Sequence, residues 1–177
     1  MSRDHSGDET DVHPGGDAND VQRVTDRPGV TVSRNVDHPP EAVMAVLLRA
    51  PTFPVWVVGP GRVVDVDGAW PGVGSGFTHE TGRGPLKVRD RTIVQFLDRD
   101  NGRITLLACV WPVGEALIQI HVTPHGQHGS RVVMHERPVA GPGSWLPQIV
   151  YRPALLGRNL VSIRRLERLV ARAEGHR

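Results

Sequence analysis

The sequence has one cysteine and no long apolar run among its 177 residues. A lone cysteine excludes an intrachain disulfide, and the position of Cys109 within the apolar residues 106–110 predicts a small buried side chain. No stretch reaches the roughly 18 apolar residues of a membrane span. Residues 1–10 are polar and acidic, unlike a signal peptide. We therefore expect a cytoplasmic protein without stable membrane insertion.

Several motifs that bind nucleotides or hydrolyse esters are also missing. The chain has no P-loop, no Gly-x-Ser-x-Gly nucleophile elbow and no Gly-x-Gly-x-x-Gly dinucleotide fingerprint. His125 and His128 lie in a glycine-rich turn with no acidic or cysteine neighbours, which is a poor arrangement for metal ligands. We expect neither a metal site nor a cofactor.

Charge is unevenly distributed along the chain, although the formal net charge is only +2. Residues 1–28 are acidic and almost free of large apolar side chains, which predicts a disordered tail; an alternative is that this tail docks on the basic C-terminus. Residues 152–177 carry seven arginines against Glu167 and Glu174. Because no aromatic side chains interleave with these arginines, we interpret them as a solvated helix face and expect no nucleic-acid partner.

Apolar periodicity predicts a strand, short helical segments, six more strands and a long final helix. Residues 30–36 alternate as in a strand, Asp37 is a candidate N-cap for a helix over 41–49, and residues 51–60 form a second helical segment or a lid. Turn signals separate the six strands, which are predicted over residues 62–67, 76–81, 86–98, 103–111, 116–123 and 130–138.

The final helix is predicted over residues 146–173. Leucine, isoleucine and valine recur at helical spacing from Leu156 to Val170, which defines one apolar stripe. Pro153 is expected to begin or kink this helix, because proline lacks the backbone N–H of a helix interior.

Short motifs occur in a characteristic order along this pattern. They are Val-Asp-His-Pro-Pro-Glu-Ala-Val at 36–43, Val-Asp-Gly at 66–68, Trp-Pro-Gly-Val-Gly-Ser at 70–75, the turn at 82–85, Gly-Pro at 141–142 and Arg-Asn-Leu at 158–160. In this order, residues 29–174 resemble the START/Bet v 1-like (SRPBCC) superfamily, in particular the polyketide cyclase/dehydrase and lipid-transport type of actinobacteria.

The resemblance implies an α+β helix-grip fold. In this fold a curved antiparallel sheet of about seven strands wraps around the long C-terminal helix, and short helices follow the first strand. It also implies an apolar ligand cavity between the sheet and that helix. Activities diverge widely on this fold, so the fold alone does not define a function.

A possible polar pair comes from the hairpin after residue 76. If Arg83 and Gly84 centre its turn, His79 lies opposite Asp90 and Phe77 lies opposite Thr92. A carboxylate that orients an imidazole suits a general base. The alternative is a structural cross-strand pair.

Glu136 is a second candidate for proton transfer. It shares a strand face with Val132 and Met134, which predicts that it points inward. A buried carboxylate needs a partner, which Arg158 or Asn159 on the final helix could supply. The alternative interpretation is a clamp between helix and sheet.

Large apolar side chains could line the predicted cavity, with a few polar groups to orient a ligand. The candidate ligand-binding residues are Trp56, Phe77, Thr92, Trp111, Met134, Trp145, Tyr151 and Asn159. We therefore expect binding of a small apolar ligand, lipid-like or aromatic and polyketide-like, by a monomer or homodimer. Two alternatives stay open: a cyclase or aromatase-type enzyme using His79 with Asp90, or Glu136, and a partner-binding domain without a specific ligand.

Overall fold

The computed structural model describes residues 29–82 and 87–175. The predicted tail (1–28) and the centre of the predicted hairpin turn lie outside these residues. The elements in chain order are β1 (Val30–Val36), α2 (Pro40–Leu47), η1 (Ala50–Thr52), α3 (Phe53–Trp56), β2 (Val63–Val66), β3 (Gly76–Thr81), β4 (Val88–Asp98), β5 (Arg103–Val110), β6 (Gly114–His125), β7 (Gly129–Ala140), α4 (Pro142–Trp145) and α5 (Gln148–Glu174).

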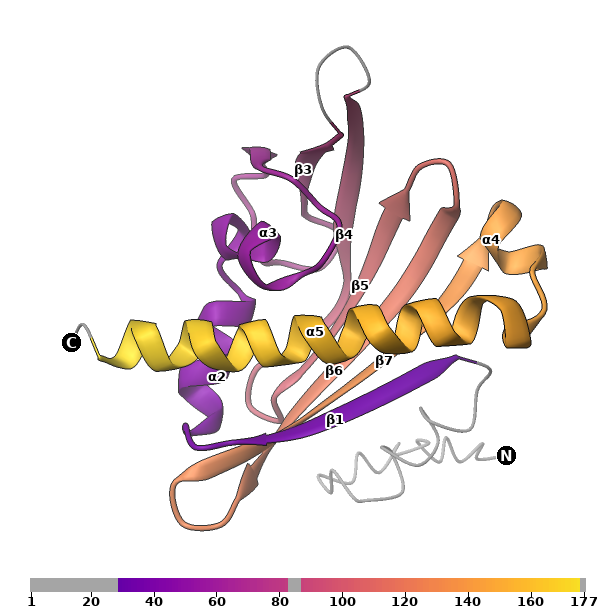
Figure 1. Ribbon diagram of the computed structural model, residues 1–177. Helices are drawn as coiled ribbons and strands as arrows, with labels where there is room; N and C mark the ends of the chain where they lie inside the picture. The colour runs from indigo at the N-terminus through magenta and orange to yellow at the C-terminus, as the bar shows by residue number, and fades with distance from the viewer. Residues whose placement is uncertain (1–28, 83–86, 176–177) are drawn as a thin grey trace, which may run out of the picture.

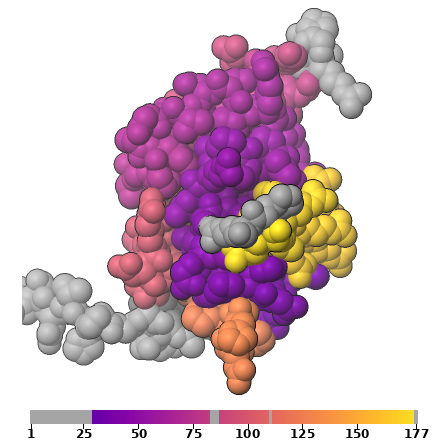
Figure 2. Space-filling view, turned by 90° about the vertical axis from the view of Figure 1, so that its left-hand side faces the viewer, coloured from indigo at the N-terminus to yellow at the C-terminus, as the bar shows by residue number. Residues whose placement is uncertain are grey.

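The strands form one antiparallel sheet in the order β1-β7-β6-β5-β4-β3-β2. Figure 1 shows α5 lying across one face of this sheet, with α2 and α3 near its C-terminal half. Figure 2, seen from the side where α5 ends, shows residues of β1 to β3, coloured indigo to purple, packed around that end. The predicted helix-grip fold is confirmed.

The core lies between the sheet and α5. Inward residues alternate along the strands, as expected for a sheet with one covered face. An aromatic cluster fills the space next to α3: the Phe53 ring lies 5.3 Å from that of Trp56 and 4.8 Å from that of Phe77, both edge to face. This cluster fixes α3 against β3.

The glycine-rich segment between β2 and β3 closes one side of the core. Trp70 packs edge to face on Phe77 at 5.0 Å and donates its Nε1–H to the carbonyl of Leu48 at 2.7 Å. A Cβ on Gly76 would lie only 2.4 Å from the carbonyl oxygen of Thr92, so only glycine allows β3 to approach β4 here. The segment therefore joins the first helices to the sheet.

Two local expectations were wrong, one at α2 and one in α5. The residue before α2 is Pro39, and no side chain caps that helix, so Asp37 is not the N-cap. Pro153, expected to begin or kink the final helix, does not begin it, because it lies five residues after the first residue of α5, Gln148. Leu156 is exposed, because the residues that α5 buries start only at Asn159. The predicted apolar stripe therefore does not cover the core along the N-terminal part of α5.

Candidate functional site

A small cavity lies between the inner face of the sheet and α5. Its volume is about 90 Å³. Residues of β3, β4 and β5 form one wall, and α3 with the following loop and α5 form the other; the lining residues used below are His79, Asp90, Thr92, Ala108, Trp111 and Arg158. The polar groups His79, Asp90 and Thr92 gather on the β3–β4 side.

The β3–β4 register agrees with the turn-based prediction. His79 pairs with Asp90, and Phe77 pairs with Thr92. Asp90 does not hold the Nδ1 atom of the imidazole, however: its Oδ1 accepts the backbone N–H of Trp111 at 3.1 Å. Asp90 thus ties β4 to the end of β5 while lying opposite His79.

Two buried polar atoms in the cavity wall have no hydrogen-bond partner. They are Nδ1 of His79, whose side chain is only 3 % exposed, and Oγ1 of Thr92, which is fully buried. A buried polar group without a partner costs roughly 1–3 kcal/mol. Both residues line the cavity.

Burial sets the protonation state of His79. Desolvation lowers the pKa of its imidazole below the ordinary value, and the negative charge of Asp90 opposes this only in part. The neutral imidazole is therefore the favoured form in the folded protein. A neutral ring nitrogen without a partner can accept a proton or a hydrogen bond.

This lowered pKa predicts a pH dependence of stability. Below its unfolded pKa of about 6.5, His79 takes up a proton more readily in the unfolded chain, so the folded state loses stability as the pH falls. The loss is at most about 1.4 kcal/mol per pH unit from this one group. His79→Gln should lose less free energy of unfolding than the parent between pH 7 and about pH 5, measured by urea titration.

His135 provides a matched comparison, because burial also lowers its pKa. Its Nδ1 lies 2.8 Å from Oγ1 of Thr31, away from the cavity residues. His135→Gln should likewise lose less free energy of unfolding than the parent as the pH falls from 7 to about 5. A curve for His79→Gln that is parallel to the parent curve would contradict the assignment of a neutral His79.

Glu136 is tied to α5 by an ion pair. Its carboxylate is 1 % exposed, and both of its oxygens accept from Nη2 of Arg158 at 2.8 Å. Asn159 lies beside this pair, where its Oδ1 accepts from Nε of Arg158 at 3.4 Å while its Nδ2 has no partner. The geometry is that of a clamp between β7 and α5, with Arg158 also lining the cavity.

The predicted ligand-binding residues fall into three groups. Thr92 and Trp111 line the cavity. A second group is buried and outside the cavity lining, namely Trp56, Phe77, Met134 and Asn159. Trp145, on α4, is 80 % exposed, and Tyr151 is half-buried near the start of α5; neither lines the cavity.

Sequence reasoning missed Ala108 as a cavity residue. Ala108 pairs with Thr92 across β4 and β5 and is buried. Its strand alternation with Leu106 predicts an inward position, and its small side chain leaves room beside Thr92. Cys109 is only half-buried, although burial still raises the pKa of its thiol.

The described part of the chain offers no cluster of three or more His, Cys, Asp or Glu side chains that could hold a metal ion. Within the same residues, no helix has the length and apolar character to cross a bilayer.

This sheet, grip helix and cavity define a helix-grip domain of the SRPBCC type. The family described as "Polyketide cyclase / dehydrase and lipid transport" matches residues 27–174, and the chain belongs to it. No curated protein matches the chain.

Solved structures agree on the fold. The chain is similar to the protein TTHA0849 from Thermus thermophilus, with 20 % identity and a TM-score of 0.59 over 82 % of this chain and 99 % of that chain. A conserved protein from Geobacillus kaustophilus is 12 % identical with a TM-score of 0.63, and the match covers 81 % of this chain and 95 % of that chain. Ara h 8.0201 is 9 % identical with a TM-score of 0.58, and the match covers 81 % of this chain and 97 % of that chain. At such identities the likeness concerns the fold alone.

Proposed function

We propose that the cavity binds a small molecule with an apolar body and one hydrogen-bonding group. The observation that carries this proposal is the pair of buried, unpartnered atoms, Nδ1 of His79 and Oγ1 of Thr92, in the cavity wall. A hydroxyl or carbonyl placed between them would satisfy both, while Ala108 and Ile118 offer an apolar surface to the rest of the ligand.

The size of the cavity limits what it encloses. Its volume of about 90 Å³ is below the ~150 Å³ of an engineered cavity that holds benzene, and far below the ~300–1,000 Å³ typical of drug-sized ligands. We infer that it takes the compact polar end of a ligand. A longer apolar part would extend past Trp111, where the cavity reaches the end of the sheet.

Phenol and toluene form a matched pair of probes for this proposal, because they differ by a hydroxyl in place of a methyl group. Both are larger than benzene, so the substituent end would enter the cavity and the ring would extend toward Trp111. The neutral imidazole of His79 should accept the phenol hydroxyl, so phenol should bind more tightly than toluene by about tenfold, the worth of one buried hydrogen bond. Isothermal titration calorimetry measures both affinities.

His79→Phe removes the acceptor and keeps a ring at this position. In this variant the preference should reverse in favour of toluene. Equal affinities of the parent protein for the two probes, or a phenol preference that survives in His79→Phe, would contradict the proposal. Native mass spectrometry of the purified protein would identify a co-purifying ligand.

A second candidate function is proton transfer on the bound molecule, as in a cyclase or aromatase. It is favoured by the neutral His79 facing the carboxylate of Asp90 within one cavity. In such an enzyme, His79 would take a proton from the substrate and Asp90 would stabilise the imidazolium. His79→Ala would then abolish turnover with little change in ligand affinity, whereas for a carrier it would change affinity alone.

A further inference from the structure

Several exposed segments lie together at one end of the sheet, where neighbouring strands begin and end; this end is called the edge below. Antiparallel pairing brings together the end of β3 and the start of β4 (Thr81 with Val88), the β5–β6 turn (Val110 with Gly114) and the end of β7 (Glu115 with Ala140). Figure 1 shows these ends and α4 along the same side of the molecule. The cavity reaches this edge, where Thr81 and Trp111 line it.

Large apolar side chains are exposed at this edge. Trp111 in the β5–β6 turn is 68 % exposed, Trp145 of α4 is 80 % exposed, and Ile149 in the first turn of α5 is 84 % exposed. Val113, Leu146 and Val150 are exposed beside them in sequence. We call these six residues the edge patch: Trp111, Val113, Trp145, Leu146, Ile149 and Val150.

The edge patch is held together by the backbone. The N–H of Gly143 donates to the carbonyl of Val113 at 2.7 Å, so α4 is fastened to the β5–β6 turn. A Cβ on Gly143 would lie 2.4 Å from a methyl of Val113, which shows how closely the two segments pack. The contact fixes α4 beside the β5–β6 turn. Exposed apolar side chains gathered in one region mark interaction sites.

An exposed cation lies beside the edge patch on α5. No acidic residue occurs between residues 141 and 166, and Arg152 is exposed one turn after Ile149. Glu115, at the start of β6, is half-buried. The apolar surface therefore has a cationic border on its α5 side.

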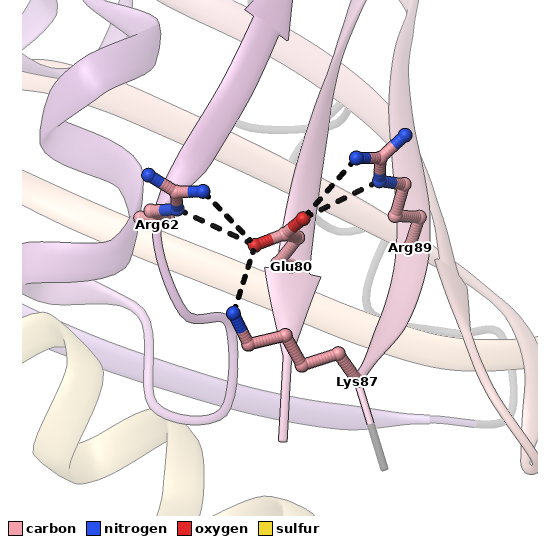
Figure 3. Close-up of polar contacts among 4 residues, drawn as sticks. All are labelled: Arg62, Glu80, Lys87 and Arg89. Carbon is pink, nitrogen blue, oxygen red and sulfur yellow. Dashed lines mark hydrogen bonds and ion pairs between the residues drawn. The ribbon is translucent and has the colours of Figure 1, made fainter. Parts of the chain in front are cut away.

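A second group of cations lies at the β3–β4 end of the same edge. Figure 3 shows Arg62, Lys87 and Arg89 around one carboxylate, that of Glu80, with N–O distances of 3.3, 3.8 and 3.4 Å. Although desolvation opposes it, hydrogen bonding from Arg62 and Arg89 lowers the pKa of Glu80, so the carboxylate is charged. Three cations against one anion leave two positive charges on an exposed surface.

We propose that this edge docks on an anionic lipid bilayer. The edge patch would enter the headgroup region, where tryptophan is favoured, and Arg152 with the Glu80 cluster would contact anionic headgroups. Docking places the cavity mouth against the lipid; the use of that orientation for ligand transfer rests on the function proposed above. A second copy of the chain fits less well, because a two-fold contact would bring the same cations together.

Vesicles of three parts phosphatidylcholine to one part phosphatidylglycerol test the proposal by co-sedimentation with the full chain. We expect binding to these vesicles, weakening as salt is added, and much weaker binding to pure phosphatidylcholine. Trp145→Ser with Ile149→Ser should weaken binding by about tenfold or more, since two apolar side chains no longer enter the interface. Arg62→Gln with Arg89→Gln should weaken it by about fivefold per charge on the anionic vesicles alone.

Two control variants make single substitutions of the same kind, apolar to serine and arginine to glutamine, far from the edge patch. Phe96→Ser changes an exposed aromatic residue in the distal half of β4, and Arg168→Gln changes an exposed arginine in the C-terminal half of α5. Both should bind vesicles like the parent protein. Loss of binding in these controls equal to that in the patch variants would overturn the proposal.

Two further results would also overturn it. One is the absence of vesicle binding by the parent protein. The other is a dimer in sedimentation velocity that Trp145→Ser with Ile149→Ser dissociates, which would assign the edge patch to a second copy. Phenol affinity of the patch variants separates this test from that of the cavity: it should be unchanged even where vesicle binding is lost.

Discussion

Arg158→Met should lower the free energy of unfolding by about 3–5 kcal/mol at pH 7, measured by urea denaturation. The substitution keeps a long side chain on α5 and leaves the Glu136 carboxylate, 1 % exposed, without its cation. Removing one partner of a buried ion pair is costly, because the remaining charge has been taken out of water without compensation.

Two controls separate the ion pair from general effects on α5. Arg152→Met makes the same change at an exposed arginine of the same helix and should change stability by less than about 0.5 kcal/mol. Glu136→Gln combined with Arg158→Met removes both charges and should recover part of the loss. A deficit below about 1 kcal/mol in Arg158→Met, or no recovery in the double variant, would show that the clamp contributes little.

Ala108→Leu should abolish phenol binding while the protein stays folded. The alanine side chain borders the cavity next to Thr92, and leucine adds three carbon atoms to a space of about 90 Å³. Binding should weaken more than about tenfold, because the added branch occupies the position of the probe. Stability should stay within about 1.5 kcal/mol of the parent, since the cavity accepts the new volume. Calorimetry and urea denaturation measure the two quantities.

Ala108→Gly is the opposing control at the same position. It enlarges the cavity and should bind phenol as well as the parent does, yet it should be less stable by roughly 0.5–1 kcal/mol, the cost of glycine in a strand. Loss of binding in Ala108→Leu but not in Ala108→Gly would therefore not be due to lost stability. Undiminished phenol affinity in Ala108→Leu would place the probe elsewhere on the protein.

Much of the fold could be predicted from the sequence because its signals are local. Strand alternation and turn residues located all seven strands, and centring the hairpin on Arg83 and Gly84 was enough to pair His79 with Asp90. The inward position of Glu136 followed from alternation along its strand. The family resemblance then supplied the wrapping of the sheet around the last helix.

The site could not be predicted to the same extent because it depends on packing between distant segments. Periodicity cannot show that Asp90 accepts the backbone N–H of Trp111 and leaves Nδ1 of His79 unpartnered. It also cannot show that the N-terminal part of α5 extends beyond the core, which exposes Leu156, or that α4 leaves Trp145 exposed. Apolar residues predicted to line a cavity were therefore distributed between the core and the surface.

The most direct test of the account is the nitrogen-15 NMR spectrum of the histidine rings during a phenol titration. Binding in the cavity predicts that the ring-nitrogen resonances of His79 shift as Nδ1 gains a partner, that toluene leaves them nearly unchanged, and that the exposed rings of His125 and His128 report no change. Phenol-dependent shifts at the exposed histidines with His79 unmoved would contradict the claim that this cavity is the ligand site.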